Sequence, residues 1–196
     1  MSRLIAFGCS FTYGHGLSDC KETDTGWSGP SKFAWPSMLA NKLNYKLDNQ
    51  SYPGSSNLEI LYKVLSFKFE PDDVVVIMWT LPLRDTQFDE SGVPTIRLGP
   101  WAKSWVAKQW MKIASETDYT QRSWLYIHHA DLYLKNKSIQ YFHCPAYSYD
   151  NRPEYLNIEH VYLKTLVKAD RAEDGAHPGL DSHRQTAEKI FGFINE

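Results

Sequence analysis

Two short apolar runs dominate the hydrophobic pattern of the chain. One covers residues 4–7, and the other, at residues 74–78, reads Val-Val-Val-Ile-Met. A continuous run of this length, rich in β-branched side chains, is typical of a parallel strand that is buried on both faces. We therefore predict strands over both runs, with two weaker strands at residues 45–49 and 139–143.

Between these runs the apolar residues change to helical spacing. In residues 58–65 they recur every three to four positions, which predicts an amphipathic helix. Three other helices are expected. One is capped by Ser31, one is capped by Thr117 or Asp118, and the last covers residues 180–195.

Strands that alternate with helices predict an α/β protein with a parallel sheet and right-handed crossovers. We expect a three-layer α/β/α sandwich around a short, flavodoxin-like parallel sheet, with ligands bound beyond the carboxyl ends of the strands. Residues 80–118 break this rhythm with prolines, glycines and three tryptophans, Trp101, Trp105 and Trp110. We interpret this segment as an insertion over the active edge. Its tryptophans either stack on sugar rings or, as we favour, fill a small core.

Length and charge narrow the class of protein. The chain has 196 residues, 42% of them hydrophobic, so residues 1–196 are expected to form one domain around one core. A formal net charge of -2 offers no basic surface, and nucleic acid is not an expected partner. The apolar run at residues 4–7 is too short for a signal peptide, and no run approaches the roughly 20 residues that span a bilayer. We expect a cytoplasmic protein with no membrane partner.

The cysteines fit the same compartment. Cys9, Cys20 and Cys144 are odd in number and form no Cys-x-x-Cys unit, which favours a reducing environment. We interpret Cys9 as a small packed hydrophobe, although its place beside a candidate nucleophile would also suit a reactive thiol.

Candidate chemistry lies near the two ends of the sequence. Ser10 follows the first apolar run within Gly8-Cys9-Ser10, where a strand end would expose a hydroxyl at the sheet edge. His177 stands three residues after Asp174, a spacing that lets one short turn hold an imidazole against a carboxylate. A serine hydroxyl needs such a base to attack a carbonyl. Ser10, Asp174 and His177 are therefore a candidate catalytic triad.

These two blocks, with residues 52–57 between them, resemble the SGNH or GDSL-type hydrolases in motif and in order along the chain. The resemblance implies a cofactor-independent serine hydrolase that cleaves a carboxylic ester through an acyl-enzyme. Ser10 would be the nucleophile, His177 the base and Asp174 the residue that orients it. The implied substrate is an O-acetylated carbohydrate or a small acyl ester.

The oxyanion hole departs from the family pattern. The resemblance implies backbone donors at Ser10 and Gly54, but the asparagine that usually follows the central strand is absent from this chain. Asn57, Thr80 or Arg84 could replace it, and Arg84 would bring a full charge suited to an oxyanion or to an acidic substrate. Cys9 also stands where the family usually has aspartate.

Three functions other than ester hydrolysis were compared with this sequence: a binding or structural module, metal binding and nucleotide binding. A hydrolase-like binding or structural module of a larger assembly would keep the same scaffold without efficient turnover, and an oligomer is compatible with either function. No recognised ligand spacing links His128, His129, His143 and Cys144, so no metal is expected. The glycines after the first run lack the spacing of a phosphate-binding loop or a dinucleotide fingerprint, which makes nucleotide binding a weak alternative.

Overall fold

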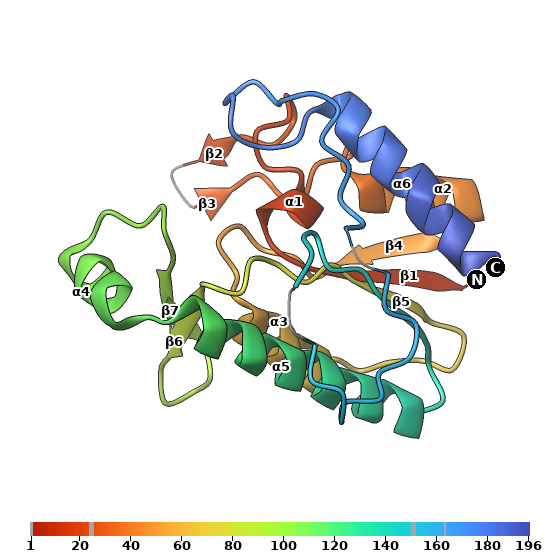
Figure 1. Ribbon diagram of the computed structural model, residues 1–196. Helices are drawn as coiled ribbons and strands as arrows, with labels where there is room; N and C mark the ends of the chain where they lie inside the picture. The colour runs from red at the N-terminus through yellow and green to blue at the C-terminus, as the bar shows by residue number, and fades with distance from the viewer. Residues whose placement is uncertain (1, 24–25, 150–151, 163) are drawn as a thin grey trace.

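The computed structural model describes residues 2–23, 26–149, 152–162 and 164–196. Its centre is a four-stranded parallel sheet in the order β4-β1-β5-β8 (Figure 1). The strands are β1 (Arg3–Phe7), β4 (Lys46–Asn49), β5 (Val74–Ile77) and β8 (Gln140–His143). Because the strands are parallel, their carboxyl ends share one edge of the sheet. The predicted parallel α/β fold is confirmed.

Helices cover both faces of this sheet (Figure 1). Leu4, Ala6 and their neighbours on one face pack with α2 (Trp35–Leu43) and α6 (Leu180–Ile194). Ile5 and Phe7 point to the other face, where they pack with α3 (Asn57–Ser66) and α5 (Glu116–Asn136). Successive residues of a strand face opposite sides, so an unbroken apolar run is what a sheet covered on both faces requires.

Helix α2 starts later than predicted. Its N-cap is Ala34, which offers no capping side chain, while the hydroxyl of Ser31 donates to Asp19 Oδ1 at 2.5 Å in the preceding loop. The backbone N–H of Trp35 instead donates to Nδ1 of His183 at 3.1 Å. An imidazole from α6 thus takes the place of a local cap, and the predicted Ser31 cap was wrong for that reason.

The start of α5 was also misplaced. The helix begins at Glu116, and the hydroxyl of Ser115 accepts from the N–H of Asp118. Ser115 is therefore the cap, not Thr117 or Asp118. The chain after β8 forms an isolated parallel bridge between Val161 and His143, and contains no helix among residues 154–162 and 164–168.

Residues 80–118 leave the sandwich and carry elements of their own. Strands β6 (Asp85–Phe88) and β7 (Pro94–Leu98) form an antiparallel hairpin, and α4 (Trp105–Ile113) lies beyond it, away from the sheet (Figure 1). Trp101 is 45% exposed and Trp105 is 73% exposed. The expected small tryptophan core was wrong for these two residues, whereas Trp110 is partly buried and donates to the hydroxyl of Tyr119 at 2.8 Å.

Three short elements complete the structure. Helix α1 (Ser10–Tyr13) follows β1 directly, and β2 (Glu22–Thr23) pairs antiparallel with β3 (Gly26–Trp27) in the polar loop.

All three cysteines are buried free thiols, which agrees with a packing role for Cys9. Burial raises the pKa of Cys144 to about 12. Within the described ranges, no helix is both long and apolar enough to cross a bilayer.

His183 makes stability depend on pH in a way that can be measured. Burial lowers its pKa from 6.5 to about 4, so the unfolded chain binds a proton between these pH values that the folded chain does not. Stability is therefore fully present above pH 6.5 and falls as the pH drops toward 4, by about 3 kcal/mol for a shift of this size. We expect His183→Gln to be less stable at pH 7 but to lose less stability across that window.

Urea unfolding at pH 7, 5.5 and 4 would check this prediction. His129→Gln is a matched control, because His129 is exposed on α5. Parallel pH dependence of the unfolding free energy in the wild type and in His183→Gln would contradict the assignment.

Candidate active site

Ser10 lies at the carboxyl end of β1, where the chain turns sharply into α1. Gly8 permits this turn, because a Cβ added there would lie 2.0 Å from Thr12 Oγ1 and 3.2 Å from the carbonyl oxygen of Met78. Cys9, which directly precedes Ser10, is fully buried, and its sulfur accepts a hydrogen bond from the hydroxyl of Thr80 at 3.1 Å. The turn leaves Ser10 95% buried but still in contact with a cavity.

Asp174 and His177 form the predicted pair within one tight loop. Nδ1 of the imidazole lies 2.6 Å from Asp174 Oδ2, and the backbone N–H groups of Ala176 and His177 donate to Oδ1 at 2.9 Å each. Partial burial opposes ionisation, but these donors outweigh it and lower the pKa of Asp174 to about 2. The carboxylate's contribution to stability is therefore fully present above about pH 4 and is lost as the pH falls from there to about 2. This pairing leaves Nε2 of His177 to act as base.

The N-terminal loop completes the surroundings of the carboxylate. Gly16 has a φ of +87°, and a Cβ built there would lie 2.7 Å from Asp174 Oδ2. The backbone carbonyl oxygen of Gly16 accepts a hydrogen bond from the N–H of Glu173 at 3.2 Å. His15 Nε2 is 3.8 Å from the same carboxylate oxygen, and its ring centroid is 4.4 Å from that of His177. Segments near both ends of the sequence thus build one charged cluster.

His15, Asp174 and His177 could also hold a metal ion, because one ligand atom from each lies within 4.8 Å of the others. This cluster was not among the histidines considered from the sequence. A metal at this place would use the carboxylate and the imidazole that the triad needs. Metal binding and general-base chemistry would therefore compete for the same atoms.

One cavity of about 470 Å³ brings the predicted groups together, and we call it the serine cavity. It is lined by Ser10, Phe11, His15, Trp27, Pro53, Gly54, Arg84, Arg97, Trp101, Ala176 and His177. In the described part of the chain, Ser10 and His177 share this cavity without a hydrogen bond between their side chains. Such contacts are often long without substrate and shorten in the complex.

Ser10 and Gly54, whose backbone N–H groups are the predicted oxyanion donors, both line the serine cavity. The N–H groups of Ser10 and Gly54 donate to no backbone or side-chain acceptor among the described residues. Gly54 has a φ of +81°, and a Cβ built there would lie 3.2 Å from Cδ of Arg97. Both N–H groups are available for an oxyanion.

The three side chains expected to complete the oxyanion hole differ in position. Nδ2 of Asn57 is within hydrogen-bond distance of Thr80 O, Ser123 Oγ and Tyr149 OH, and its Oδ1 accepts from the N–H of Thr80. Asn57 and Thr80 are buried and are not part of the cavity lining. Their polar groups are already used inside the protein. Of the three candidates, only Arg84 lines the serine cavity.

The chain is similar to known proteins in structure, but its sequence matches none of the known families. No protein-family model and no curated protein matches the sequence. A structure assigned to the lipolytic proteins of the G-D-S-L family, from Desulfitobacterium hafniense DCB-2, is 12% identical with a TM-score of 0.53, over 97% of this chain and 98% of that chain. The psychrotrophic esterase EstA from Pseudoalteromonas sp. is 12% identical with a TM-score of 0.58, over 98% and 96%. The acetyl xylan esterase Est2A from Butyrivibrio proteoclasticus is 11% identical with a TM-score of 0.58, over 98% of this chain and 63% of that chain.

The chain has the SGNH/GDSL hydrolase fold. This confirms the fold that the sequence motifs implied. At sequence identities of 11–12% the similarity to these structures shows the fold and not the reaction, since one fold hosts many activities. The roles of individual residues in this SGNH/GDSL fold must rest on its own geometry.

Two residues that line the serine cavity, Trp27 and Arg97, were not predicted from the sequence. Trp27 lies with its ring centroid 4.3 Å from that of His15, and Arg97 comes from β7. The only sequence signal for Trp27 is an aromatic residue within a polar loop. Arg97 carries no local signal, because its position depends on how the hairpin folds over α3.

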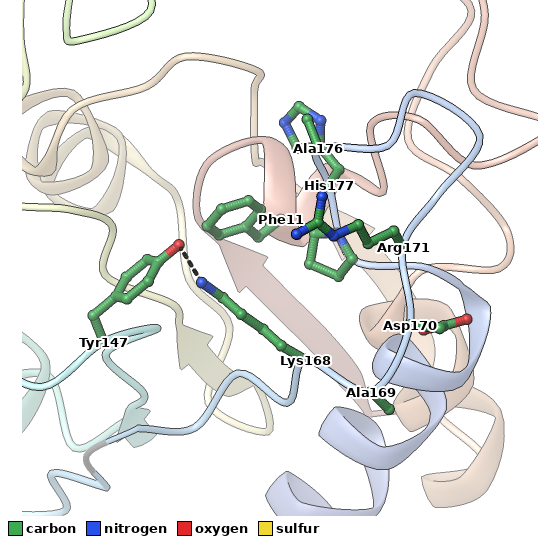
Figure 2. Close-up of a pocket in the computed structure, with 9 residues that line it drawn as sticks. Phe11, Tyr147, Lys168, Ala169, Asp170, Arg171, Ala176 and His177 are labelled. Atoms are coloured by element: carbon green, nitrogen blue, oxygen red, sulfur yellow. Dashed lines mark hydrogen bonds between the residues drawn. The ribbon is translucent and has the colours of Figure 1, made fainter.

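A second cavity adjoins the serine cavity across Phe11, Ala176 and His177, and we call it the lysine cavity. Its volume is about 340 Å³. Figure 2 shows Tyr147 and Lys168 on one side, joined by a 3.1 Å hydrogen bond, with Arg171 and Asp170 across from them. His177 therefore borders two cavities in this SGNH/GDSL fold, and Ser10 borders one.

Asp170 anchors the loop that carries Asp174 and His177. Its carboxylate accepts from the N–H groups of Asp181 at 3.1 Å and Ser182 at 2.7 Å, in the first turn of α6. The N-cap of α6 is Gly179, which has no side chain to do this. Asp170 thus caps α6 from outside the helix and closes the loop between them.

We expect Asp170→Ala to affect both stability and turnover. Loss of the cap should lower the unfolding free energy by about 1 kcal/mol. A displaced His177 should lower kcat for ester hydrolysis by about 10- to 100-fold, because a shift near 1 Å has effects of this size. Chemical unfolding and steady-state kinetics would measure the two effects, with Glu173→Ala as control for a lost loop charge. Unchanged kcat in a destabilised Asp170→Ala protein would show that the loop does not need this anchor.

Proposed function

We propose that this protein is a serine hydrolase that cleaves a carboxylic ester through a Ser10-His177-Asp174 triad and an acyl-enzyme. The observation that carries the proposal is that Ser10 and the imidazole of the His177–Asp174 pair line one cavity. Neighbouring structures of the same fold include esterases, which supports ester hydrolysis in general.

The chemistry follows from these positions. Nε2 of His177 takes the hydroxyl proton of Ser10 as Oγ attacks the ester carbonyl, and Asp174 stabilises the imidazolium without becoming protonated. The backbone N–H groups of Ser10 and Gly54 bind the oxyanion of the tetrahedral intermediate. The imidazolium then protonates the leaving alcohol, and a water activated by the same imidazole hydrolyses the acyl-enzyme.

The proposed substrate is an O-acetylated carbohydrate or another small acyl ester. A neighbour of the same fold is an acetyl xylan esterase, and this chain spans 63% of it. The serine cavity, at about 470 Å³, has the volume for a small acyl group with part of a sugar ring, and Trp27 and Trp101 supply aromatic faces. Independence from cofactors and a cytoplasmic location remain predictions from the sequence.

A second candidate function is that of a hydrolase-like binding module. Two observations favour it. Ser10 and His177 make no hydrogen bond in the described part of the chain, and the asparagine of the oxyanion hole has no counterpart at the cavity. The exposed apolar residues of α4, Trp105 at 73% and Ile113 at 83%, would suit contact with other chains of an assembly.

Labelling with a fluorophosphonate separates these two functions. We expect modification at Ser10, read by intact mass and peptide mapping, that disappears in Ser10→Ala and in His177→Ala. The reason is that only a hydroxyl activated by a base reacts efficiently with such a probe. Ser28→Ala is a control for a surface serine. A folded wild-type protein that remains unlabelled would favour the binding module.

Asp174→Asn tests the third member of the triad. The amide should hold the imidazole in the wrong tautomer and lower kcat by about 10³- to 10⁴-fold. Because the pKa of Asp174 is about 2, its charge does not change between pH 5 and 9, and the loss should be the same across that range. Rate measurements on a short acyl ester, with Glu173→Gln beside it, would check this. A loss below tenfold would remove Asp174 from the mechanism.

A further inference from the structure

Arg84 is a buried cation at the wall of the serine cavity. It directly precedes β6, is 92% buried, and shares the cavity lining with Ser10 and Gly54. Its guanidinium carbon lies 4.4 Å from the ring centroid of Trp101, so the indole covers one side of it. The side chain is therefore removed from bulk water at the place where a substrate would bind.

The structure gives this charge almost no partner. Nη1 is 3.5 Å from the carbonyl oxygen of Ser55, which is the long limit of a hydrogen bond, and Nε is buried without an acceptor. Among the described residues, no carboxylate forms an ion pair with Arg84. A buried guanidinium with unused donors is costly unless another group completes its hydrogen bonds.

The neighbouring carboxylate is already occupied. Glu59 is fully buried and accepts from Arg97 through two bonds of 2.8 and 2.9 Å, and Lys63 lies 3.1 Å away. Burial opposes ionisation of Glu59, but the hydrogen bonds from Arg97 and the charge of Lys63 hold its pKa below the usual value. The single negative charge of Glu59 thus faces the two positive charges of Arg97 and Lys63, and none of it is left for Arg84. With Arg84 added, this wall of the cavity keeps an excess of positive charge.

We propose that Arg84 binds a permanent carboxylate on the substrate, so that the serine cavity selects an anionic ester. This inference rests on the proposed ester hydrolysis and narrows its substrate class. A planar guanidinium donates to a carboxylate through two parallel hydrogen bonds, and stacking on Trp101 fixes the plane in which it does so. The carboxylate belongs either to the acyl part or to the alcohol part of the ester, and both present the same group to Arg84.

A permanent anion differs from an oxyanion in a measurable way. An oxyanion exists in every ester hydrolysis, so a residue that stabilises it affects neutral and charged esters equally. A residue that binds a substrate carboxylate affects only the ester that carries one. Paired substrates of equal shape, one charged and one neutral, therefore distinguish the two roles.

The experiment compares two such pairs on the wild type and on Arg84→Gln. Monoethyl succinate against ethyl succinamate places the charge in the acyl part, and 4-acetoxybenzoate against 4-acetoxybenzamide places it in the alcohol part. We expect the wild type to prefer the charged member of one pair. Arg84→Gln should lower kcat/KM for that member by about 10- to 100-fold, the size expected for charge-assisted hydrogen bonds, and leave its neutral partner within about twofold.

Two controls keep the outcome interpretable. Lys103→Gln removes an exposed charge from residues 80–118, the segment that also contains Arg84, and Lys103 does not line the serine cavity. Thermal unfolding shows whether Arg84→Gln is folded. The wild-type preference should weaken as salt is raised, but less than for an exposed charge. Equal losses for both members of a pair would assign Arg84 to the oxyanion and overturn the proposal. No loss for either member would overturn it as well.

Failure of the proposed hydrolysis would be seen separately. If the wild type hydrolyses none of the four esters, calorimetric titration of Ser10→Ala with monoethyl succinate still tests carboxylate binding. Binding that disappears in the Ser10→Ala, Arg84→Gln double variant would support the anion site while removing the catalytic role. Absence of binding to Ser10→Ala at millimolar ligand, together with absence of hydrolysis, would overturn both proposals.

Discussion

The carboxylate of Asp170 holds the first turn of α6, and the geometry of the candidate triad depends on that bond. The helix begins at a glycine, so the N–H groups of Asp181 and Ser182 find no local cap and donate to Asp170 instead. A Cβ at Gly179 would lie 2.5 Å from Asp170 Oδ2, so the close approach itself requires glycine. The cap closes a loop whose two ends meet at a bridge between Arg171 and Pro178.

A loop closed in this way is well suited to present an acid and a base. The N–H of Ala172 donates to the carbonyl of His177 at 2.9 Å, so the two arms of the loop are bonded to each other. Helix α6 is in turn fixed to α2 by the bond from Trp35 to His183. Rigid support of this kind keeps an imidazole within the narrow range of positions that proton transfer requires.

Much of the sheet and the pairing of Asp174 with His177 could be predicted from the sequence, because both rest on short-range patterns. A β-branched run specifies β5, and the spacing of Asp174 and His177 specifies a turn that pairs them. The helix-cap prediction that failed depended on a contact between residues distant in sequence. Ser31 was not the cap of α2 because His183 supplies the acceptor, and that could not be seen locally.

The same limit applies to the oxyanion candidates. The sequence left Asn57, Thr80 and Arg84 open as possible donors, yet Asn57 is used to join Thr80, Ser123 and Tyr149 inside the core. Only the fold of the hairpin could show that Arg84 reaches the cavity and that Trp101 covers it rather than filling a core. Side-chain environment, unlike strand pattern, is set by tertiary packing.

The approach of Gly16 to Asp174 gives the site a further property. The Asp174 carboxylate lies in the loop that precedes α6 and is approached by the loop that follows β1, so neither end of the described chain can build the site alone. The Asp174–His177 pair itself is a local feature of one loop. Its place beside the serine cavity requires both segments, so docking of this loop against the loop that follows β1, and not formation of the pair, is what assembles the candidate site.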